Sequence, residues 1–475
     1  MKVLLVGNPR TVMGFNRLTK LPSLNLASLA ANIEEGLAEV KIADMVLKQK
    51  HAEKILLQLL ASFKPDVVGF TAMSFQYQTA LKLIRATKSF SPKIATILGG
   101  YHATADADAI LSGPDHELID YIIEGEGEVP FNALIKALHS NNAVDDVPGI
   151  LFRKNGSIIK NPRAELLATE NIRLPKRDAR IYRKGFHIMG MPADVIETSR
   201  GCVYDCNFCS IRHMYGKSFR KFTTERIIED LEDAKRFGAK SIFITDDNIT
   251  IDPKRLQRLC DDIVAAKLNM TFAVQASVRG FKKNPDLAEA MAKAGTKFVF
   301  LGIENASDSA LDYMQKSNQL TSADTIAVVK QLKKFGIIIV GGFIFGYPED
   351  DKQTLIENFN FAKRIGVDIQ LFNILTPHLK TELRDDLLEK GLITNIEDYT
   401  KYNHFASNVK TNHLSCDELF EIRNKLDARY PVESGAIFRL IRAYPGFFTS
   451  LVMKMILDEP KNWINFTTGF LTKRF

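Results

Sequence analysis

Short apolar runs alternate with amphipathic segments along the first 140 residues of the chain. The apolar runs are rich in β-branched residues and end in glycine or polar turns, which predicts buried strands. They lie at 2–7, 38–44, 66–73, 93–100 and 121–128. The segments between them repeat apolar residues at helical spacing and predict helices at 23–35, 52–63, 78–90 and 129–139. This order predicts an α/β domain with a doubly wound parallel sheet over residues 1–140.

The loops that follow these strands are candidate ligand contacts. In a doubly wound sheet, ligands bind beyond the carboxyl ends of the strands. Glycine in such loops lets a bulky planar ligand approach the backbone. One glycine-rich loop is a weak signal, but four on one edge together predict a binding site. The candidate residues are Asn8, Pro9, Thr71, Ser74, Gly99, Gly100, His102, Gly125 and Glu126.

Residues 141–193 differ in character from the domain before them. The stretch ILFRKNGSIIK predicts a β-hairpin that turns at Asn155 and Gly156. The residues after it are basic, contain several prolines and show no clear period. We therefore interpret 141–193 as a linker with a hairpin between two domains.

A second alternation of strands and helices begins at residue 194 and continues to about residue 380. Helical segments such as TERIIEDLEDAKRFG fill every gap between its strands. The predicted strands lie at 194–199, 241–247, 271–277, 298–304, 338–346 and 368–375. Six such units predict a partial (β/α)6 barrel over 194–380, whose functional face is the carboxyl ends of its strands. Residues 381–475 are predicted to form a helical C-terminal domain.

Composition and charge describe an ordinary soluble protein. Hydrophobic residues make up 45% of the 475 residues and charged residues 25%. No apolar run approaches the length of a membrane-spanning helix, and MKVLLVGNPR reads as a strand and not as a signal peptide. The expected location is the cytoplasm. A net charge of +7 without a concentrated basic patch gives no nucleic-acid footprint. It favours an ordinary solvated surface, with docking of an acidic redox partner as the alternative.

Three of the five cysteines lie close together in SRGCVYDCNFCSIR, directly after the first predicted barrel strand. They are Cys202, Cys206 and Cys209, whereas Cys260 and Cys416 are isolated and are expected to pack on helix faces. A structural zinc site needs four ligands, and His213 follows at a spacing that does not suggest a fourth. A four-iron cluster held by three thiolates keeps one iron open, which is a catalytic arrangement. The spacing favours the cluster and leaves zinc or inert cysteines as alternatives.

The cysteine loop resembles that of the radical S-adenosylmethionine (SAM) enzymes. Their CxxxCxΦC signature appears here as Cys202, Cys206, Phe208 and Cys209. In that family the three thiolates hold a 4Fe-4S cluster, and the open iron binds the amino and carboxylate groups of SAM. Further barrel segments are similar to those of the family: FLGIEN at 300–305 and GGFIFGYPED at 341–350.

The resemblance implies a set of cofactor contacts in the barrel. Phe208 would lie near the cluster and adenine, and Arg200 and Gly201 would flank the cysteines. Glu304 would face the cofactor, although a charged strand end in solvent is the alternative reading of the same residue. The implied SAM contacts are Phe208, Gln275, Glu304, Gly342 and Gly346.

The order of the domains resembles the cobalamin-binding branch of this superfamily over residues 1–380. ILGGYHAT and IIEGEGE are typical of its Rossmann-like cobalamin domain. The DxHxxG motif that supplies an axial histidine in many cobalamin proteins is absent, because Asp44 and His51 have the wrong spacing. Many members of the branch lack this motif too, so the axial contact stays open, with residues 71–74 as candidates.

The resemblance implies a methyltransferase that acts on an unactivated carbon of a hydrophobic small molecule. A 5′-deoxyadenosyl radical would take a hydrogen atom from the substrate, methylcobalamin would supply the methyl group, and a flavodoxin- or ferredoxin-type donor would supply the electron. Two alternatives remain: a radical cyclase or rearrangement enzyme with the same cofactors, and a cobalamin or iron–sulfur sensor without turnover.

The last forty residues are aromatic and basic, with Trp463 and several phenylalanines among Lys and Arg. This composition predicts a helix that covers the barrel mouth, or an amphipathic helix that touches an anionic membrane surface. Together with the cysteine loop, this tail is similar to the methylases of hopanoid and related isoprenoid lipids.

Overall fold

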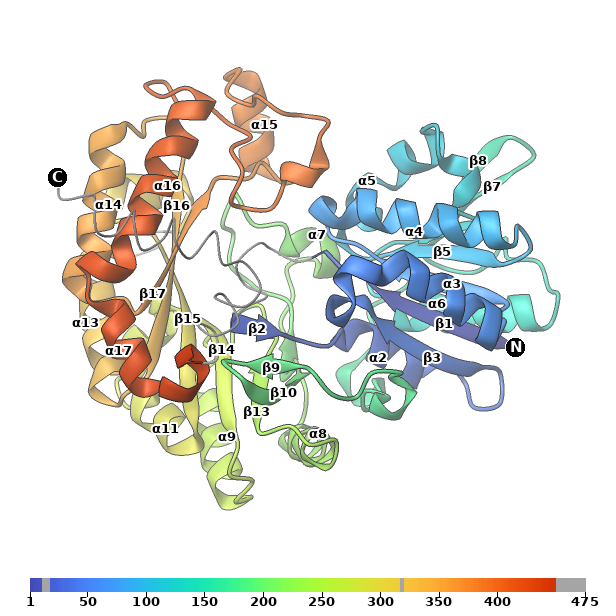
Figure 1. The fold of residues 1–475 in the computed structure, drawn as a ribbon, viewed down its shortest axis with the longest axis horizontal. Helices are drawn as coiled ribbons and strands as arrows, with labels where there is room; N and C mark the ends of the chain where they lie inside the picture. Colours follow the sequence, from blue (N-terminus) through green and yellow to red (C-terminus); the bar gives the residue numbers. More distant parts are fainter. Residues whose placement is uncertain (11–17, 317–319, 450–475) are drawn as a thin grey trace.

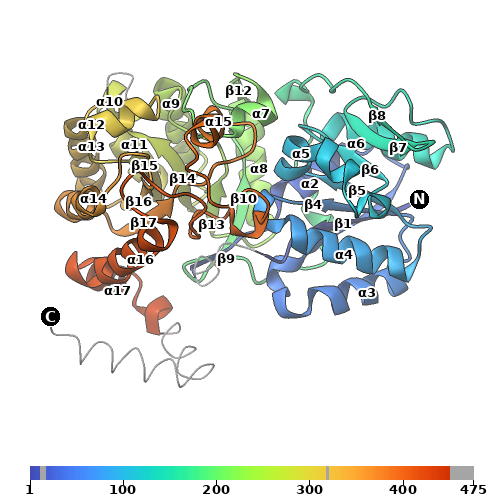
Figure 2. The same ribbon diagram turned by 90° about the horizontal axis from the view of Figure 1, so that it is seen from above.

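The computed structural model describes residues 1–10, 18–316 and 320–449, which form two lobes joined along one side (Figure 1). The N-terminal lobe, blue to cyan, holds the first sheet, and the second lobe, green to orange, holds the barrel. The view from above shows the two lobes side by side, with the C-terminal helices against the barrel (Figure 2).

The N-terminal sheet has the strand order β3-β1-β4-β5-β6-β7-β8. Its first five strands are parallel: β3 (Glu39–Asp44), β1 (Lys2–Gly7), β4 (Val67–Thr71), β5 (Ala95–Gly99) and β6 (Tyr121–Ile123). From β1 the chain moves outward to β3 and then crosses back over β1 to β4, so the topological switch point, where such sheets bind ligands, lies between β1 and β4. The predicted doubly wound sheet is confirmed.

The predicted hairpin at Asn155 and Gly156 is present, but it does not stand apart as a linker element. It consists of β7 (Ile150–Lys154) and β8 (Ser157–Lys160), and β7 pairs antiparallel with β6. The hairpin therefore extends the N-terminal sheet and covers the edge that β6 would otherwise leave unpaired.

Side chains of β1 alternate between two cores on opposite faces of the sheet. Val3 and Leu5 pack beneath α2 (Leu24–Asn32) and α6 (Glu128–His139). Leu4 and Val6 pack on the other face, which is covered by α3 (Ala52–Phe63), α4 (Tyr77–Phe90) and α5 (Tyr101–Ser112). Burial on both faces explains why these strands read as continuous apolar runs. The sequence pattern predicted each of these helices except α5.

The second sheet has the order β17-β16-β15-β14-β13-β10-β9-β2. Its six parallel strands match the six predicted units: β10 (Met191–Ile196), β13 (Ser241–Ile244), β14 (Thr271–Ser277), β15 (Thr296–Glu304), β16 (Ile338–Phe345) and β17 (Ile369–Ile374). The outer helices are α8 (Thr224–Arg236), α9 (Pro253–Ala265), α11 (Leu287–Ala294), α13 (Ser322–Lys334) and α14 (Lys352–Ile365). The predicted partial barrel is confirmed.

The barrel sheet ends on a strand that comes from the N-terminal part of the chain. Strand β2 (Thr19–Lys20) precedes α2 of the N-terminal lobe, yet it pairs antiparallel with β9 (His187–Ile188). Strand β9 pairs in turn with β10. The two lobes are therefore interlaced through a shared sheet edge.

Helices dominate the described part of the C-terminal region: α15 (Glu382–Glu389), α16 (Cys416–Glu433) and α17 (Ala436–Ala443). After α17, Tyr444, Phe447 and Phe448 pack in one cluster with Ala273 and Phe298. These two residues lie near the amino ends of β14 and β15. Up to residue 449 the segment thus covers the end of the barrel opposite its mouth, contrary to the expectation of a cover over the mouth.

The rest of the tail, including Trp463, lies outside the described residues. Among the described residues, no helix combines the length and the apolar character needed to cross a membrane.

A buried guanidinium joins the lobes beside the cysteine loop. Arg200, in β11 (Ser199–Arg200), donates two hydrogen bonds to Glu197 at 2.7 and 2.8 Å and one to Glu128 at 2.8 Å. Its third carboxylate partner is Glu126 at 3.4 Å, which also pairs with Arg220 of β12 (Arg220–Lys221). Glu126 and Glu128 belong to the N-terminal lobe, so the network ties the start of α6 to the first barrel loop.

The ionised state of Glu128 depends on this network. Burial alone would raise the pKa of Glu128, but Arg200 and the hydroxyl of Ser28 outweigh it and hold the pKa below its usual value. Ser28 donates a hydrogen bond of 2.7 Å to the same carboxylate.

A second buried arginine fixes the segment that the sequence predicts as a linker. Arg177 is 1% exposed and pairs with Asp194 of β10 at 3.1 Å and with Asp230 and Asp233 of α8 at 2.7 and 2.9 Å. The segment is irregular but bound to the barrel through these charges.

Replacement of Arg200 by methionine is expected to destabilise the protein strongly. The substitution leaves Glu128 and Glu197 buried without a cation, which typically costs about 3–5 kcal/mol. Thermal unfolding followed by circular dichroism measures the loss as a lower midpoint. Arg236→Met is the matched control, because Arg236 is 72% exposed and its pair with Asp233 is worth at most about 1 kcal/mol. Equal midpoints for the two variants would contradict a structural role of the network.

Candidate active site

The three cysteines lie in the loop between β11 and α7 (Ile211–Tyr215). All three are free thiols and partly buried. The loop begins at Gly201, whose φ is +85° and where a Cβ atom would lie 2.5 Å from the carbonyl oxygen of Ser218. The amide of Gly201 donates to Asp247 at 3.0 Å, and Asn207 donates to the carbonyl of Tyr313 at 2.7 Å. These contacts fix both ends of the loop against the barrel.

Burial keeps the thiols protonated when no cation is bound. It raises the pKa of Cys209 to about 12, and it raises the pKa of Cys202 and Cys206 as well. The thiols also raise one another's pKa values, which shows that they share one electrostatic environment. Since thiolates are the metal-binding form, a metal group bound here would displace protons. The donor set therefore fits a cationic iron group.

A single metal ion has a different requirement. In the described part of the chain, no three His, Cys, Asp or Glu side chains converge closely enough to hold one ion. A cubane does not require such convergence, because each thiolate binds its own iron atom.

Glu304 ends strand β15 in a strained conformation next to this loop. The register between β15 and β16 shifts between Gly302 and Glu304, and Glu304 has a φ of +66°. A bulge with a left-handed residue re-aims the side chain and costs about 1–3 kcal/mol. Glu304 forms an ion pair with Lys316. A Cβ atom at Gly302 would lie 2.6 Å from the carboxylate of Glu304, so glycine leaves room for the pair.

Lys316 brings a positive charge to the thiols. Burial raises the pKa values of Cys202 and Cys206, and the ammonium group of Lys316 offsets part of that rise. Burial disfavours the charge of Lys316, but Glu304 and the thiols of Cys206 and Cys209 outweigh it and raise the pKa of Lys316. Sequence analysis did not find this residue, because MQKSNQ carries no motif or period that marks a buried lysine.

Phe208 and Glu304 line a cavity of about 540 Å³ at the mouth of the barrel. Phe300 of β15 and Ile344 of β16 line the same cavity, and a Cβ atom at Gly342 would lie 2.8 Å from the ring of Phe300. The N-terminal lobe contributes Phe75 and Gln76 to its wall. The cavity is therefore shared by both lobes and touches the cysteine loop. We call it the mouth cavity.

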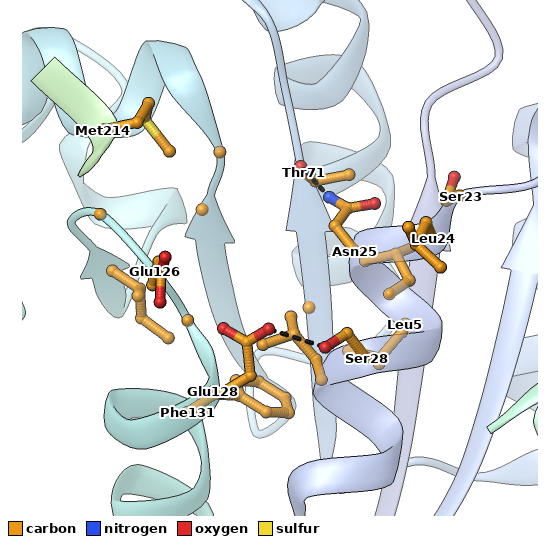
Figure 3. Close-up of a pocket in the computed structure, with 18 of the residues that line it drawn as sticks. Leu5, Ser23, Leu24, Asn25, Ser28, Thr71, Glu126, Glu128, Phe131 and Met214 are labelled. Atoms are coloured by element: carbon orange, nitrogen blue, oxygen red, sulfur yellow. Dashed lines mark hydrogen bonds between the residues drawn. The ribbon is translucent and has the colours of Figure 1, made fainter. Parts of the chain in front are cut away.

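A second cavity, of about 450 Å³, lies at the carboxyl ends of β1, β4, β5 and β6 (Figure 3). We call it the sheet-edge cavity. Five predicted residues line it: Thr71, Gly99, Gly100, Gly125 and Glu126. Figure 3 shows Asn25 and Ser28 of α2 facing Thr71 and Glu128, with hydrogen bonds of 3.2 Å to Thr71 and 2.7 Å to Glu128.

The sheet-edge cavity fits part of a large ligand that contacts the backbone. No atom lies within 4 Å of a Cβ placed on Gly99, so the backbone faces open space there. Gly100 has a φ of +92°, and a Cβ on it would lie 2.7 Å from Thr71 Oγ1. Barrel residues Arg200, Tyr215 and Asp247 complete the wall. Burial raises the pKa of Asp247 to about 6, a feature that the sequence did not reveal.

The other predicted N-terminal residues lie outside the wall of this cavity. Asn8 donates a hydrogen bond of 3.1 Å to the carbonyl of Gln76, and Pro9 lines a separate groove with α3. Ser74 and His102 contact each other at 3.3 Å. The ring of His102 lies between those of Tyr77 and Tyr399, with centroid distances of 4.3 and 4.8 Å. Burial lowers the pKa of His102 to about 4.

Two predicted barrel residues also take other places. Gln275 donates to the carbonyl of Asp246 at 3.3 Å. Gly346 has a φ of +103°, and a Cβ on it would lie 2.9 Å from Leu419 of α16. It therefore allows the strand end to pack against that helix.

Comparisons with known proteins agree with this arrangement. The model of the radical SAM superfamily matches residues 196–362, and that of the B12 binding domain matches residues 10–135. The chain is 29% identical to Uncharacterized methyltransferase PH0819 of Pyrococcus horikoshii, over 96% of this chain and 98% of that protein. It is also 29% identical to Hopanoid C-3 methylase of Methylococcus capsulatus, over 80% of this chain and 72% of that protein.

The fold is similar to a solved structure of the radical S-adenosylmethionine methyltransferase TsrM from Kitasatospora setae. That structure has tryptophan substrate and a SAM analogue bound. The TM-score is 0.68 at 17% identity, over 83% of this chain and 77% of that chain.

Replacement of Cys202, Cys206 or Cys209 by alanine is expected to remove bound iron and the brown absorbance. The wild-type protein, purified without air, should carry about four irons per chain. Cys260→Ala and Cys416→Ala are controls, because Cys260 packs in the barrel core on α9 and Cys416 begins α16. Iron analysis and visible spectra provide the measurement. Full iron in the three loop variants would refute the ligand assignment.

Lys316 and Glu304 are expected to shift the reduction potential of the cluster in opposite directions. Loss of a nearby positive charge disfavours added electrons, so Lys316→Met should make the potential more negative, and Glu304→Gln should make it more positive. A redox titration of SAM-free protein, followed by electron paramagnetic resonance, measures both shifts. Lys293→Met is the control, since this lysine of α11 is 68% exposed and pairs with Glu289. Shifts of one sign in both variants would contradict the electrostatic role.

Proposed function

The chain is a radical SAM enzyme with a cobalamin-binding domain, and we propose that it transfers a methyl group to an unactivated carbon of an apolar small molecule. Its cofactors are a 4Fe-4S cluster, SAM and cobalamin. One observation carries the proposal: the mouth cavity is lined by Phe208 and Glu304 of the barrel and by Phe75 and Gln76 of the N-terminal lobe. A substrate held there would contact the parts of the protein that bind both cofactors.

The residues have distinct roles in this proposal. Cys202, Cys206 and Cys209 would hold the cluster, and Phe208 and Glu304 would contact SAM. Around cobalamin, the contacts would come from Thr71, Gly99, Gly100, Gly125 and Glu126. When bound, these groups supply radical formation and methyl transfer, which no side chain provides.

The protein itself contributes position and the exclusion of water. The charge network of Arg200 holds the two lobes in one relative placement, which fixes the distance between the cofactor sites. Aromatic and aliphatic side chains around the mouth cavity keep water from reactive species. Glu304 is held in place by its strained bulge and by Lys316.

The walls of the mouth cavity support an apolar substrate. They include Phe75, Phe208, Phe300, Leu371 and Phe405. An apolar molecule gains about 25 cal/mol for each Å² that it buries on such walls. Similarity to Hopanoid C-3 methylase supports a lipid as one such substrate.

We also propose two partners. Arg212, Lys217 and Lys380 surround an opening of about 320 Å³ that reaches Cys206 and Cys209, and this cationic rim suits an acidic flavodoxin- or ferredoxin-type electron donor. A peripheral membrane contact is supported by α17, where Phe438 and Ile441 are 66% and 42% exposed next to Arg442.

A labelling experiment tests the methyl transfer. Anaerobically reconstituted protein is incubated with reductant, SAM carrying a trideuteromethyl group, and the apolar extract of cells that lack the protein. We expect 5′-deoxyadenosine together with a product that carries the deuterated methyl group, both detected by mass spectrometry. Cys206→Ala is expected to yield neither.

Two results would contradict the proposal. Formation of 5′-deoxyadenosine with a rearranged but unlabelled product would indicate cyclisation or rearrangement. Absence of 5′-deoxyadenosine from protein with a full cluster would favour the sensor.

A further inference from the structure

Two histidines from the segment after β17 line the mouth cavity, together with Phe208 of the cysteine loop. His378 and His404 have ring centroids 5.0 Å apart with planes at 60°. The carbonyl of His404 accepts a hydrogen bond of 2.7 Å from the amide of Ile374, at the end of β17. The pair is therefore attached to the carboxyl end of a barrel strand, where barrel enzymes place their functional groups.

Both imidazoles are neutral near pH 7. Burial lowers the pKa of His378 to about 3, with a further contribution from His404 and Arg384. The side chain of His404 is exposed, and the ordinary pKa of histidine, about 6.5, already leaves it mainly neutral near pH 7. A neutral imidazole carries one hydrogen-bond donor and one acceptor. The Nδ1 atom of His378 is buried and has no hydrogen-bond partner among the described residues.

The described wall of the mouth cavity offers no free counterion to an ionised group of the substrate. Glu304 is the one carboxylate among the described residues of the wall, and it is paired with Lys316. No lysine or arginine belongs to the described wall. An anionic or cationic substrate would thus lose its hydration without gaining a counterion.

We propose that His378 and His404 hold a neutral oxygen-bearing group, a hydroxyl or a carbonyl, of an otherwise apolar substrate. The assignment rests on the proposed function and narrows its substrate class. A hydroxyl both donates and accepts a hydrogen bond. Two neutral imidazoles can satisfy both, one with its acceptor nitrogen and the other with its donor nitrogen. The two histidines are positioning residues, because a carbon that loses a hydrogen atom needs no base. They determine which carbon faces the cofactors.

Binding of small fused-ring probes tests this assignment without knowledge of the natural substrate. The probes are decalin, 2-decalol, 2-decalone and decalin-2-carboxylate, measured by equilibrium dialysis against reconstituted protein loaded with SAM under anaerobic conditions. We expect the alcohol or the ketone to bind about tenfold more tightly than decalin, the value of one good hydrogen bond. The carboxylate should bind most weakly.

Variants identify the groups that give this preference. His378→Phe and His404→Phe keep the aromatic volume and are expected to abolish the tenfold preference while changing decalin binding less than about twofold. His378→Gln retains donor and acceptor and should preserve much of the preference. His413→Phe is the control, because its side chain is 51% exposed and pairs with Glu349 at the surface. Iron content and thermal midpoint confirm that each variant is folded.

Equal binding of decalin and 2-decalol to the wild type, tightest binding of the carboxylate, or a preference that survives in both phenylalanine variants would overturn the assignment. None of these results depends on methyl transfer. Loss of the label in the transfer experiment would overturn the proposed function, whereas the probe preference reports only on the histidine pair.

Discussion

The relative placement of the two lobes depends on one buried guanidinium. Arg200 satisfies carboxylates from both lobes, and the residue that follows it, Gly201, begins the cysteine loop. A buried network of ion pairs stabilises only the one geometry in which every charge has its partner, because a carboxylate that loses its partner remains buried and charged. The network therefore restricts the lobes to one arrangement. As a consequence, the carboxyl ends of both sheets open toward each other, and the mouth cavity has walls from both.

Strain and charge at the site follow from this arrangement. Glu304 adopts a left-handed backbone conformation at a bulge, which a carboxylate at an ordinary strand end would avoid. The surrounding barrel compensates for this strain with a large core, to which β15 contributes Val299, Leu301 and Ile303. The stable part of the barrel thus supports the unfavourable backbone conformation that directs the Glu304 side chain to the wall of the mouth cavity.

Much of the fold could be predicted from the sequence, because buried parallel strands read as apolar runs. Helix α5 could not, since ATADADA places small and acidic residues without a helical period and Asp106 departs from helical angles. The hairpin was found from Asn155 and Gly156, but its pairing with β6 is a long-range contact that local pattern does not contain.

The candidate site also contains residues that the sequence reveals and residues that it does not. The cysteines and the glycine loops carry recognisable spacing, and five of the predicted loop residues do meet in one cavity. Lys316, His378 and His404 come from irregular segments. Only tertiary packing decides that the lysine pairs with Glu304 and that the histidines line the mouth cavity. His102, in turn, looks like a ligand contact in sequence and is packed between two tyrosine rings.

Strand β2 has a consequence for how this molecule can be divided. Only two residues long, it covers the outer side of β9 with chain that precedes almost the whole N-terminal lobe. A barrel expressed from residue 191 onward would lack both β2 and β9 and would present β10 as a bare edge, open to pairing with other chains. The barrel is thus no independent module, because its excision would expose the edge of β10 that β9 and β2 cover in the whole chain.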